Sequence, residues 1–165
     1  MTEFLQQIIN GLIVGSIYSL VALGYTMVYG ILQLINFAHG DIVMVGAMAA
    51  LLAAKVLMTL FPGLPGPLVL ALSVVAAVVV CVPLSLIIER VAYRPLRNAP
   101  RLAPLITAIG VSLTLQTIVM VFFGRNYHEF PSLVPQEPIE FHGLVISVTQ
   151  IIILVLSLVC MVCLA

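Results

Sequence analysis

The sequence predicts an all-α membrane protein with about five transmembrane helices. Of its 165 residues, 63% are hydrophobic and only 7% are charged, whereas roughly 25% of residues carry charge in soluble domains. The apolar residues gather into stretches close to the about 20 residues that a helix needs to cross a bilayer. Short polar connectors separate these stretches. We therefore expect a single transmembrane domain, with spans at residues 8–29, 42–61, 68–88, 103–123 and 144–165.

The first predicted span carries small residues along one helical face. They recur at steps of three and four residues: Gly11, Gly15, Ser19, Ala22, Thr26 and Gly30. Because helices gain little from the hydrophobic effect in lipid, small faces stabilise their association by letting backbones approach. We interpret this face as a helix-packing surface, and lining a narrow conduit is the alternative. Tyr18, Tyr25 and Tyr29 form an adjacent stripe whose hydroxyls need partners, so it should face protein or a wet cavity.

The segment at residues 31–41 is too apolar for an ordinary loop and too polar for a plain span. It contains four polar residues: Gln33, Asn36, His39 and Asp41. One interpretation is a cytoplasmic turn in which Asn36 or Asp41 caps the next helix. The other is a broken helix or re-entrant stretch at membrane depth, which is tolerated only where it is buried in protein or lines a water-filled cavity. In the second case these residues lie beside a transported solute.

The connectors on either side of the third span differ in composition. Residues 61–67 contain three prolines and two glycines, which predict a turn. Residues 89–101 hold four of the six Lys and Arg residues, namely Arg90, Arg94, Arg97 and Arg101. Positively charged connectors stay cytoplasmic, so this one is predicted inside and the N-terminus outside. Because Pro95 and Pro100 argue against a continuous helix, we interpret the connector as a solvated loop that sets topology; a docking surface for a cytoplasmic partner is the alternative.

The region after the fourth span differs in charge. Residues 124–143 carry one arginine against Glu129, Glu137 and Glu140, which favours the extracytoplasmic side. This loop is a connector or a surface that meets a solute-delivering protein. The last span stops within an apolar run that lacks basic stop-transfer residues, so we expect the sequence to be part of a longer protein.

Catalytic and metal-binding patterns are absent from the sequence. A phosphate-binding loop needs a lysine after glycine, and the single lysine, Lys55, follows Ala54. HExxH and GxSxG motifs do not occur. Cys160 and Cys163 form a CxxC pair in an apolar stretch, where further ligands for a metal are missing. The formal net charge is zero, which gives no footprint for nucleic acid. We expect no enzyme activity, no cofactor and no metal on this chain.

Three runs of the sequence closely resemble permeases of the LivH type, from bacterial ABC importers for branched-chain amino acids. They are NGLIVGSIYSLVALGYTMVYGILQLINFAHGD at residues 10–41, IERVAYRPLR at residues 88–97 and LITAIGVSL at residues 105–113. The resemblance implies a permease subunit of the inner membrane that imports leucine, isoleucine, valine or related solutes by alternating access. It also implies a second similar permease, two cytoplasmic ATPases and an extracytoplasmic solute-binding protein. Members are roughly twice as long as this chain.

Under this interpretation, the solute path or its gate should involve Asn36, His39 and Asp41 first, followed by Gln33, Tyr25 and Tyr29. Two other functions remain open. An ion-coupled secondary transporter or channel subunit would need charge buried within its spans, and only Lys55 and Asp41 are candidates. A structural membrane subunit that does not transport would tolerate loss of these polar side chains.

Overall fold

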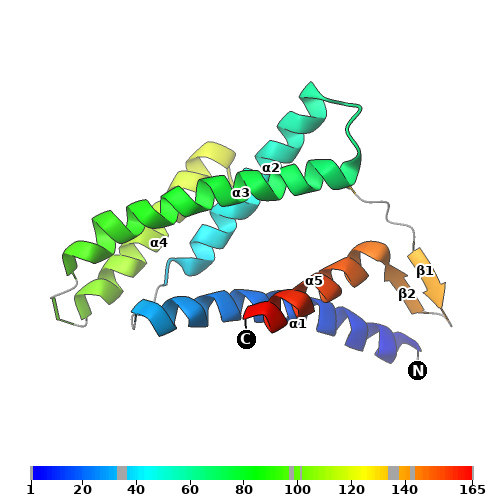
Figure 1. Cartoon of the computed structure of the whole chain (residues 1–165), viewed down its shortest axis with the longest axis horizontal. Coiled ribbons are helices and arrows are strands. Elements are labelled where there is room, and N and C mark those ends of the chain that lie inside the picture. The colour runs from blue at the N-terminus through cyan, green and yellow to red at the C-terminus, as the bar shows by residue number, and fades with distance from the viewer. Residues whose placement is uncertain are drawn as a thin grey trace. The chain divides into compact units, whose positions relative to one another are not determined.

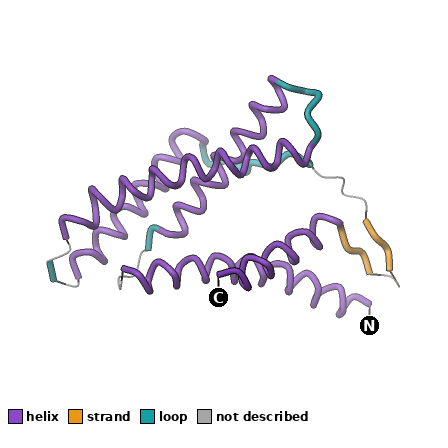
Figure 2. Tube along the Cα trace, viewed as in Figure 1, coloured by secondary structure: helices purple, strands orange, loops and turns teal. Residues whose placement is uncertain are grey.

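A computed structural model describes residues 2–32, 37–96, 99–100, 102–133, 138–141 and 144–164. These residues are almost entirely helical (Figures 1 and 2). The elements are α1 (Thr2–Leu32), α2 (His39–Leu60), α3 (Gly66–Ile88), α4 (Leu102–Phe123), β1 (Pro138–Phe141), β2 (Leu144–Ser147) and α5 (Val148–Leu164). The chain divides into two compact units, Met1–Ile31 with Val134–Ala165 and Leu32–Leu133. The helical membrane fold is confirmed, whereas the single-domain organisation stays a prediction.

In the first unit, α1 is a continuous helix of 31 residues. At the rise of an α-helix it is about 46 Å long, which exceeds the about 30 Å of a bilayer's hydrocarbon core. It therefore contains the predicted span at residues 8–29 and extends it at both ends. The added N-terminal turns carry Glu3 and Gln6, which belong at a polar interface.

The last predicted span begins later than residue 144. Residues Leu144–Ser147 form strand β2, which pairs antiparallel with β1 so that Pro138 lies opposite Ser147. The helix α5 starts at Val148 and has 17 residues. Its start is set by a reciprocal capping box: the Ser147 backbone N–H donates to Gln150 Oε1 at 3.0 Å, and the Gln150 N–H donates to Ser147 Oγ at 3.3 Å.

In the second unit, α2 and α3 form a helical hairpin that is visible in Figure 1. Residues 61–65 make the turn, which is shorter than predicted because Gly66 and Pro67 already belong to α3. Proline suits the first turn of a helix, where its missing N–H leaves no bond unmade. The Cys81 thiol on α3 lies 3.6 Å from the Ile42 carbonyl on α2. A side chain of α3 is therefore in direct contact with the backbone of α2 near the start of α2.

The arginine-bearing connector is more helical than predicted. After α3 the chain continues as a π-helix at Glu89–Tyr93 and a 3-10 turn at Arg94–Leu96. The prediction that no continuous helix runs from Arg90 to Arg101 agrees with this stretch, since the helical turns end at Leu96 and residues 99–100 are not helical. Pro95 lies within this last turn, and its missing N–H disfavours a longer regular helix. Arg97 and Arg101 lie outside the described residues.

Most apolar side chains of the described residues face outward. Only a few hydrophobic residues are buried, among them Leu51, Val69 and Leu115, while residues such as Phe122 and Val121 are exposed. In the part of the chain that is described, α1, α2, α3 and α4 are long and apolar enough to cross a membrane, and α5 is shorter. Apolar surface on this scale is typical of helices that are surrounded by lipid. A helix is tolerated there because its backbone satisfies its own hydrogen bonds.

Candidate transport site at the start of α2

A buried carboxylate joins α2 to α4. Asp41 lies in the first turn of α2 and is 9% exposed. Its Oδ1 accepts a hydrogen bond of 2.9 Å from the Nε2 of Gln116 on α4. The same Nε2 lies 3.3 Å from Ser112 Oγ, one turn earlier on α4. Asp41, Gln116 and Ser112 thus form a short polar chain between two mostly apolar helices.

The negative charge of Asp41 is well placed on its own helix. The first backbone N–H groups of a helix have no intrahelical partner and carry partial positive charge, which stabilises an anion nearby. The N-cap residue is Ala38, whose side chain makes no capping bond. The alternative in which Asp41 caps this helix is therefore wrong; Asp41 lies three residues inside it and bonds to α4. The other proposed cap, Asn36, lies outside the described residues, as does Gln33.

The start of α2 meets its neighbours partway along their lengths. Gln116 lies about 21 Å along α4 from Leu102, at the rise of an α-helix. Cys81, which contacts the start of α2 from the other side, lies about 22 Å before the end of the 3-10 turn at Leu96. The α3–α4 arm therefore extends well beyond the first turn of α2 on the side of the arginine-bearing connector.

The remaining polar candidates are distributed over both units. His39, at the start of α2, is half-buried and already has an interaction partner. Tyr25, half-buried, and Tyr29, exposed, belong to α1 in the other unit. The structure therefore brings together His39 and Asp41 at one helix start, and it does not relate the tyrosines to them.

The small-residue face of α1 borders an open groove. The groove has a volume of about 360 Å³ and is lined by Gly11, Gly15 and Ser19 of α1 together with Leu154, Ser157 and Met161 of α5. A Cβ added at Gly11 or Gly15 would meet no heavy atom within 4 Å. The role of this face in helix packing stays a prediction.

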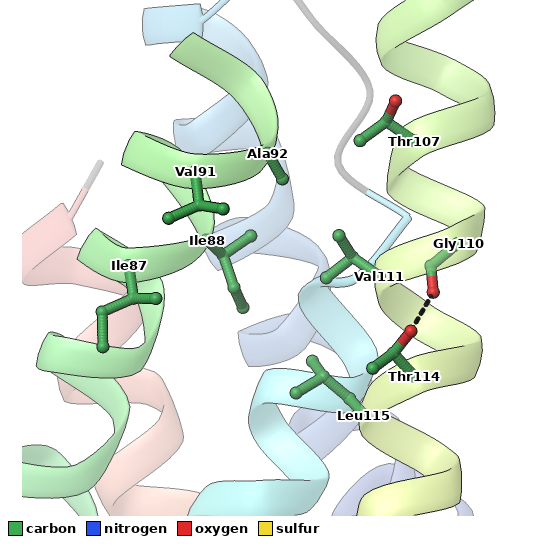
Figure 3. A pocket seen from close by; sticks show the side chains of 9 residues that line it. All are labelled: Ile87, Ile88, Val91, Ala92, Thr107, Gly110, Val111, Thr114 and Leu115. Carbon is green, nitrogen blue, oxygen red and sulfur yellow. Dashed lines mark hydrogen bonds between the residues drawn. The ribbon is translucent and has the colours of Figure 1, made fainter. Parts of the chain in front are cut away.

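A second, almost wholly apolar groove of about 450 Å³ separates α3 and its π-helical extension from α4 (Figure 3). Ile88 and Val91 line one wall, and Val111 and Leu115 line the other. The one hydroxyl drawn with a bond, that of Thr114, donates to the Gly110 carbonyl of its own helix at 2.8 Å. The groove therefore offers shape and apolar surface, with little unpaired polarity to orient a ligand.

Sequence reasoning missed Gln116 and Ser112. A glutamine within an apolar run was the available signal, because an amide at membrane depth needs a partner.

Arg90 and Arg94 are both exposed on the helical extension of α3. Among the described residues, no three His, Cys, Asp or Glu side chains gather in a way that could hold a metal ion.

The four long apolar helices α1 to α4, with the Asp41–Gln116 pair that joins α2 to α4, define a multi-pass helical membrane protein. Residues 7–165 match the family described as the branched-chain amino acid transport system permease component. The chain belongs to this permease family.

Several curated relatives are similar to the chain. The high-affinity branched-chain amino acid transport system permease protein BraD of Pseudomonas aeruginosa is 44% identical over 160 residues, which cover 94% of this chain and 52% of that protein. The corresponding protein LivH of Escherichia coli K12 is 47% identical over 131 residues, covering 79% of this chain and 42% of LivH. The chain thus spans about half the length of the curated relatives it matches. No solved structure matches it.

Proposed function

We propose that this chain is part of the transmembrane permease of an ATP-driven importer for branched-chain or related amino acids. The match of residues 7–165 to the permease family carries this proposal. The similarity to BraD and LivH supports the substrate class, since both are named for high-affinity transport of branched-chain amino acids. The apolar helices supply the membrane-spanning scaffold that such a permease needs.

The partners follow from the same proposal. A second permease subunit completes the translocation path, two cytoplasmic ATPases drive alternating access, and an extracytoplasmic binding protein delivers the solute. ATP hydrolysis takes place on the separate subunits, because this sequence has no phosphate-binding loop. The exposed Arg90 and Arg94 mark the proposed cytoplasmic side of the bacterial inner membrane.

The solute path is proposed to pass the start of α2. Helix starts at membrane depth are used near transporter substrate sites because they offer unpaired N–H groups beside a cavity. Asp41 and His39 are the described polar residues at this place. The α3–α4 arm extends about 21 Å beyond the first turn of α2 toward the arginine-bearing connector, which supports a helix that begins within the membrane rather than at its surface.

The proposal is tested by uptake of radiolabelled leucine, isoleucine and valine in cells that carry the full-length protein with its transport system. We expect uptake to depend on this subunit and to stop when ATP is depleted. A protonophore applied at constant ATP is expected to leave it unchanged. Uptake that follows an ion gradient at constant ATP would instead identify a secondary transporter.

A further inference from the structure

We propose that Gln116 is a positioning residue of the permease, and that its hydrogen bond to Asp41 is a latch between α2 and α4 that controls the conformational step of transport. This inference deepens the proposed function and rests on it. The latch consists of the Asp41 carboxylate, the Gln116 amide and the Ser112 hydroxyl.

The orientation of the Gln116 amide is fixed by its two neighbours. A carboxylate oxygen only accepts hydrogen bonds, so the amide must point its NH₂ group and not its oxygen toward Asp41. That nitrogen has two hydrogens, and it has two partners, at 2.9 Å on Asp41 and at 3.3 Å on Ser112. Hydrogen bonds to a charged acceptor are stronger than neutral ones. Gln116 therefore holds Asp41 in one position relative to α4.

This bond is a polar link between α2 and α4. The helix α2 packs along much of α3, whereas it touches α4 over a shorter stretch. At the α2–α3 contact, Gly46 leaves so little room that an added Cβ would lie 2.9 Å from Cys81 Sγ. The α2–α3 hairpin is thus closely packed, whereas α2 meets α4 over a short stretch that includes the Asp41–Gln116 bond.

The latch can also open at modest cost. When Gln116 moves away, the Asp41 carboxylate remains at the positive end of α2, beside N–H groups that lack helical partners. Apart from its polar contacts, the Gln116 side chain is exposed, so it can be rehydrated in a wet cavity. The Asp41 carboxylate is therefore partly stabilised whether the bond to Gln116 is made or broken. Such a bond can form and break during alternating access.

The first variant is Gln116→Leu, which keeps the size of the side chain and removes its amide. We expect the maximal rate of amino-acid uptake per assembled complex to fall about tenfold or more, the effect of losing one charge-assisted hydrogen bond. KM should change little, because the latch acts on the conformational step and not on solute binding. The control is Thr117→Val on the same helix; among the described residues, the Thr117 hydroxyl bonds to the Leu113 carbonyl of its own helix at 2.8 Å. It should transport normally.

The second test exchanges donor and acceptor. Gln116→Glu alone places two carboxylates together and should abolish most uptake, while the double variant Asp41→Asn/Gln116→Glu lets the new amide donate to the new carboxylate. We expect the double variant to recover uptake to within about threefold of the unaltered protein. The double variant contains the same Gln116→Glu change as the single variant. Recovery of uptake in the double variant therefore shows that this change does not by itself prevent folding.

Two results would overturn the latch: normal uptake by Gln116→Leu, or a double variant no better than Gln116→Glu. The latter would mean that the Asp41 carboxylate itself is required, independently of its bond to Gln116. If the unaltered complex took up no leucine, isoleucine or valine, the proposed function would fail instead.

Discussion

At the scale of single residues, α2 and α3 approach each other closely at Gly46. This glycine is buried, and a Cβ built on it would lie 2.9 Å from Cys81 Sγ. Real Cβ atoms are not found that close to sulfur, so a side chain here requires α2 or Cys81 to move. The absence of a side chain at Gly46 thus makes room for Cys81 against α2, in the manner of small residues in other membrane bundles.

Replacing Gly46 with alanine should therefore destabilise the protein, by about 1–3 kcal/mol as for other overpacked sites. Cys81→Ala in the same chain should relieve most of this loss, because it removes the sulfur that the new methyl group meets. Thermal unfolding of purified protein in detergent measures both effects. Gly40→Ala is the matched control on α2, since its added Cβ meets nothing within 4 Å. If Gly46→Ala is as stable as this control, the close contact is wrong.

The candidate site was only half predictable at this scale. Asp41 is conspicuous in the sequence because a carboxylate between two apolar stretches needs a reason. Its partner is separated from it by 75 positions, and no local pattern links such distant residues. A sequence therefore suggests that Asp41 needs a partner but cannot select Gln116 from the other amides and hydroxyls of the chain.

At the scale of elements, the start of α5 is defined by two side chains. Ser147 and Gln150 exchange hydrogen bonds with each other's backbone N–H groups. These bonds satisfy two donors that the first turn of the helix would otherwise leave without partners. The capping box therefore separates the apolar strand β2 from the apolar helix that follows.

Ser147→Ala should weaken this helix start by about 1 kcal/mol, the usual effect of removing a capping side chain. Hydrogen exchange of the first amides of α5 should become faster in the variant, as measured by mass spectrometry in detergent. Thr149→Val is the control, because the Thr149 hydroxyl is buried and has no hydrogen-bond partner among the described residues. Equal exchange rates in the two variants would show that Ser147 does not cap α5.

The predicted spans agree best with the structure where polar residues interrupt the hydrophobic runs. The helices α2, α3 and α4 end within about one residue of their predicted ends, because turns or charged residues follow each apolar run. The hairpin before α5 was missed, since Leu144–Ser147 is as apolar as the helix after it. Hydropathy measures polarity and cannot distinguish such a strand from a helical turn; the Ser-x-x-Gln pattern at residues 147–150 was the usable signal.

At the scale of the whole molecule, the described chain has too small a core to be stable in water by itself. Large hydrophobic residues along all the helices are exposed, including Phe4, Val79 and Leu113. Lipid is the solvent that such surfaces require, and in the proposed importer partner subunits cover part of them. We propose an orientation from charge, with Arg90 and Arg94 on the cytoplasmic side and the loop with Glu129 on the other.

This arrangement of membrane helices is tested most directly by cysteine labelling in intact cells. The native cysteines at positions 81, 160 and 163 are first replaced, and Ala99→Cys and Glu129→Cys are then introduced separately into the full-length protein. A maleimide that does not cross membranes should label Glu129→Cys in intact cells and Ala99→Cys only after permeabilisation. Labelling of Ala99→Cys from outside in intact cells would contradict the proposed orientation.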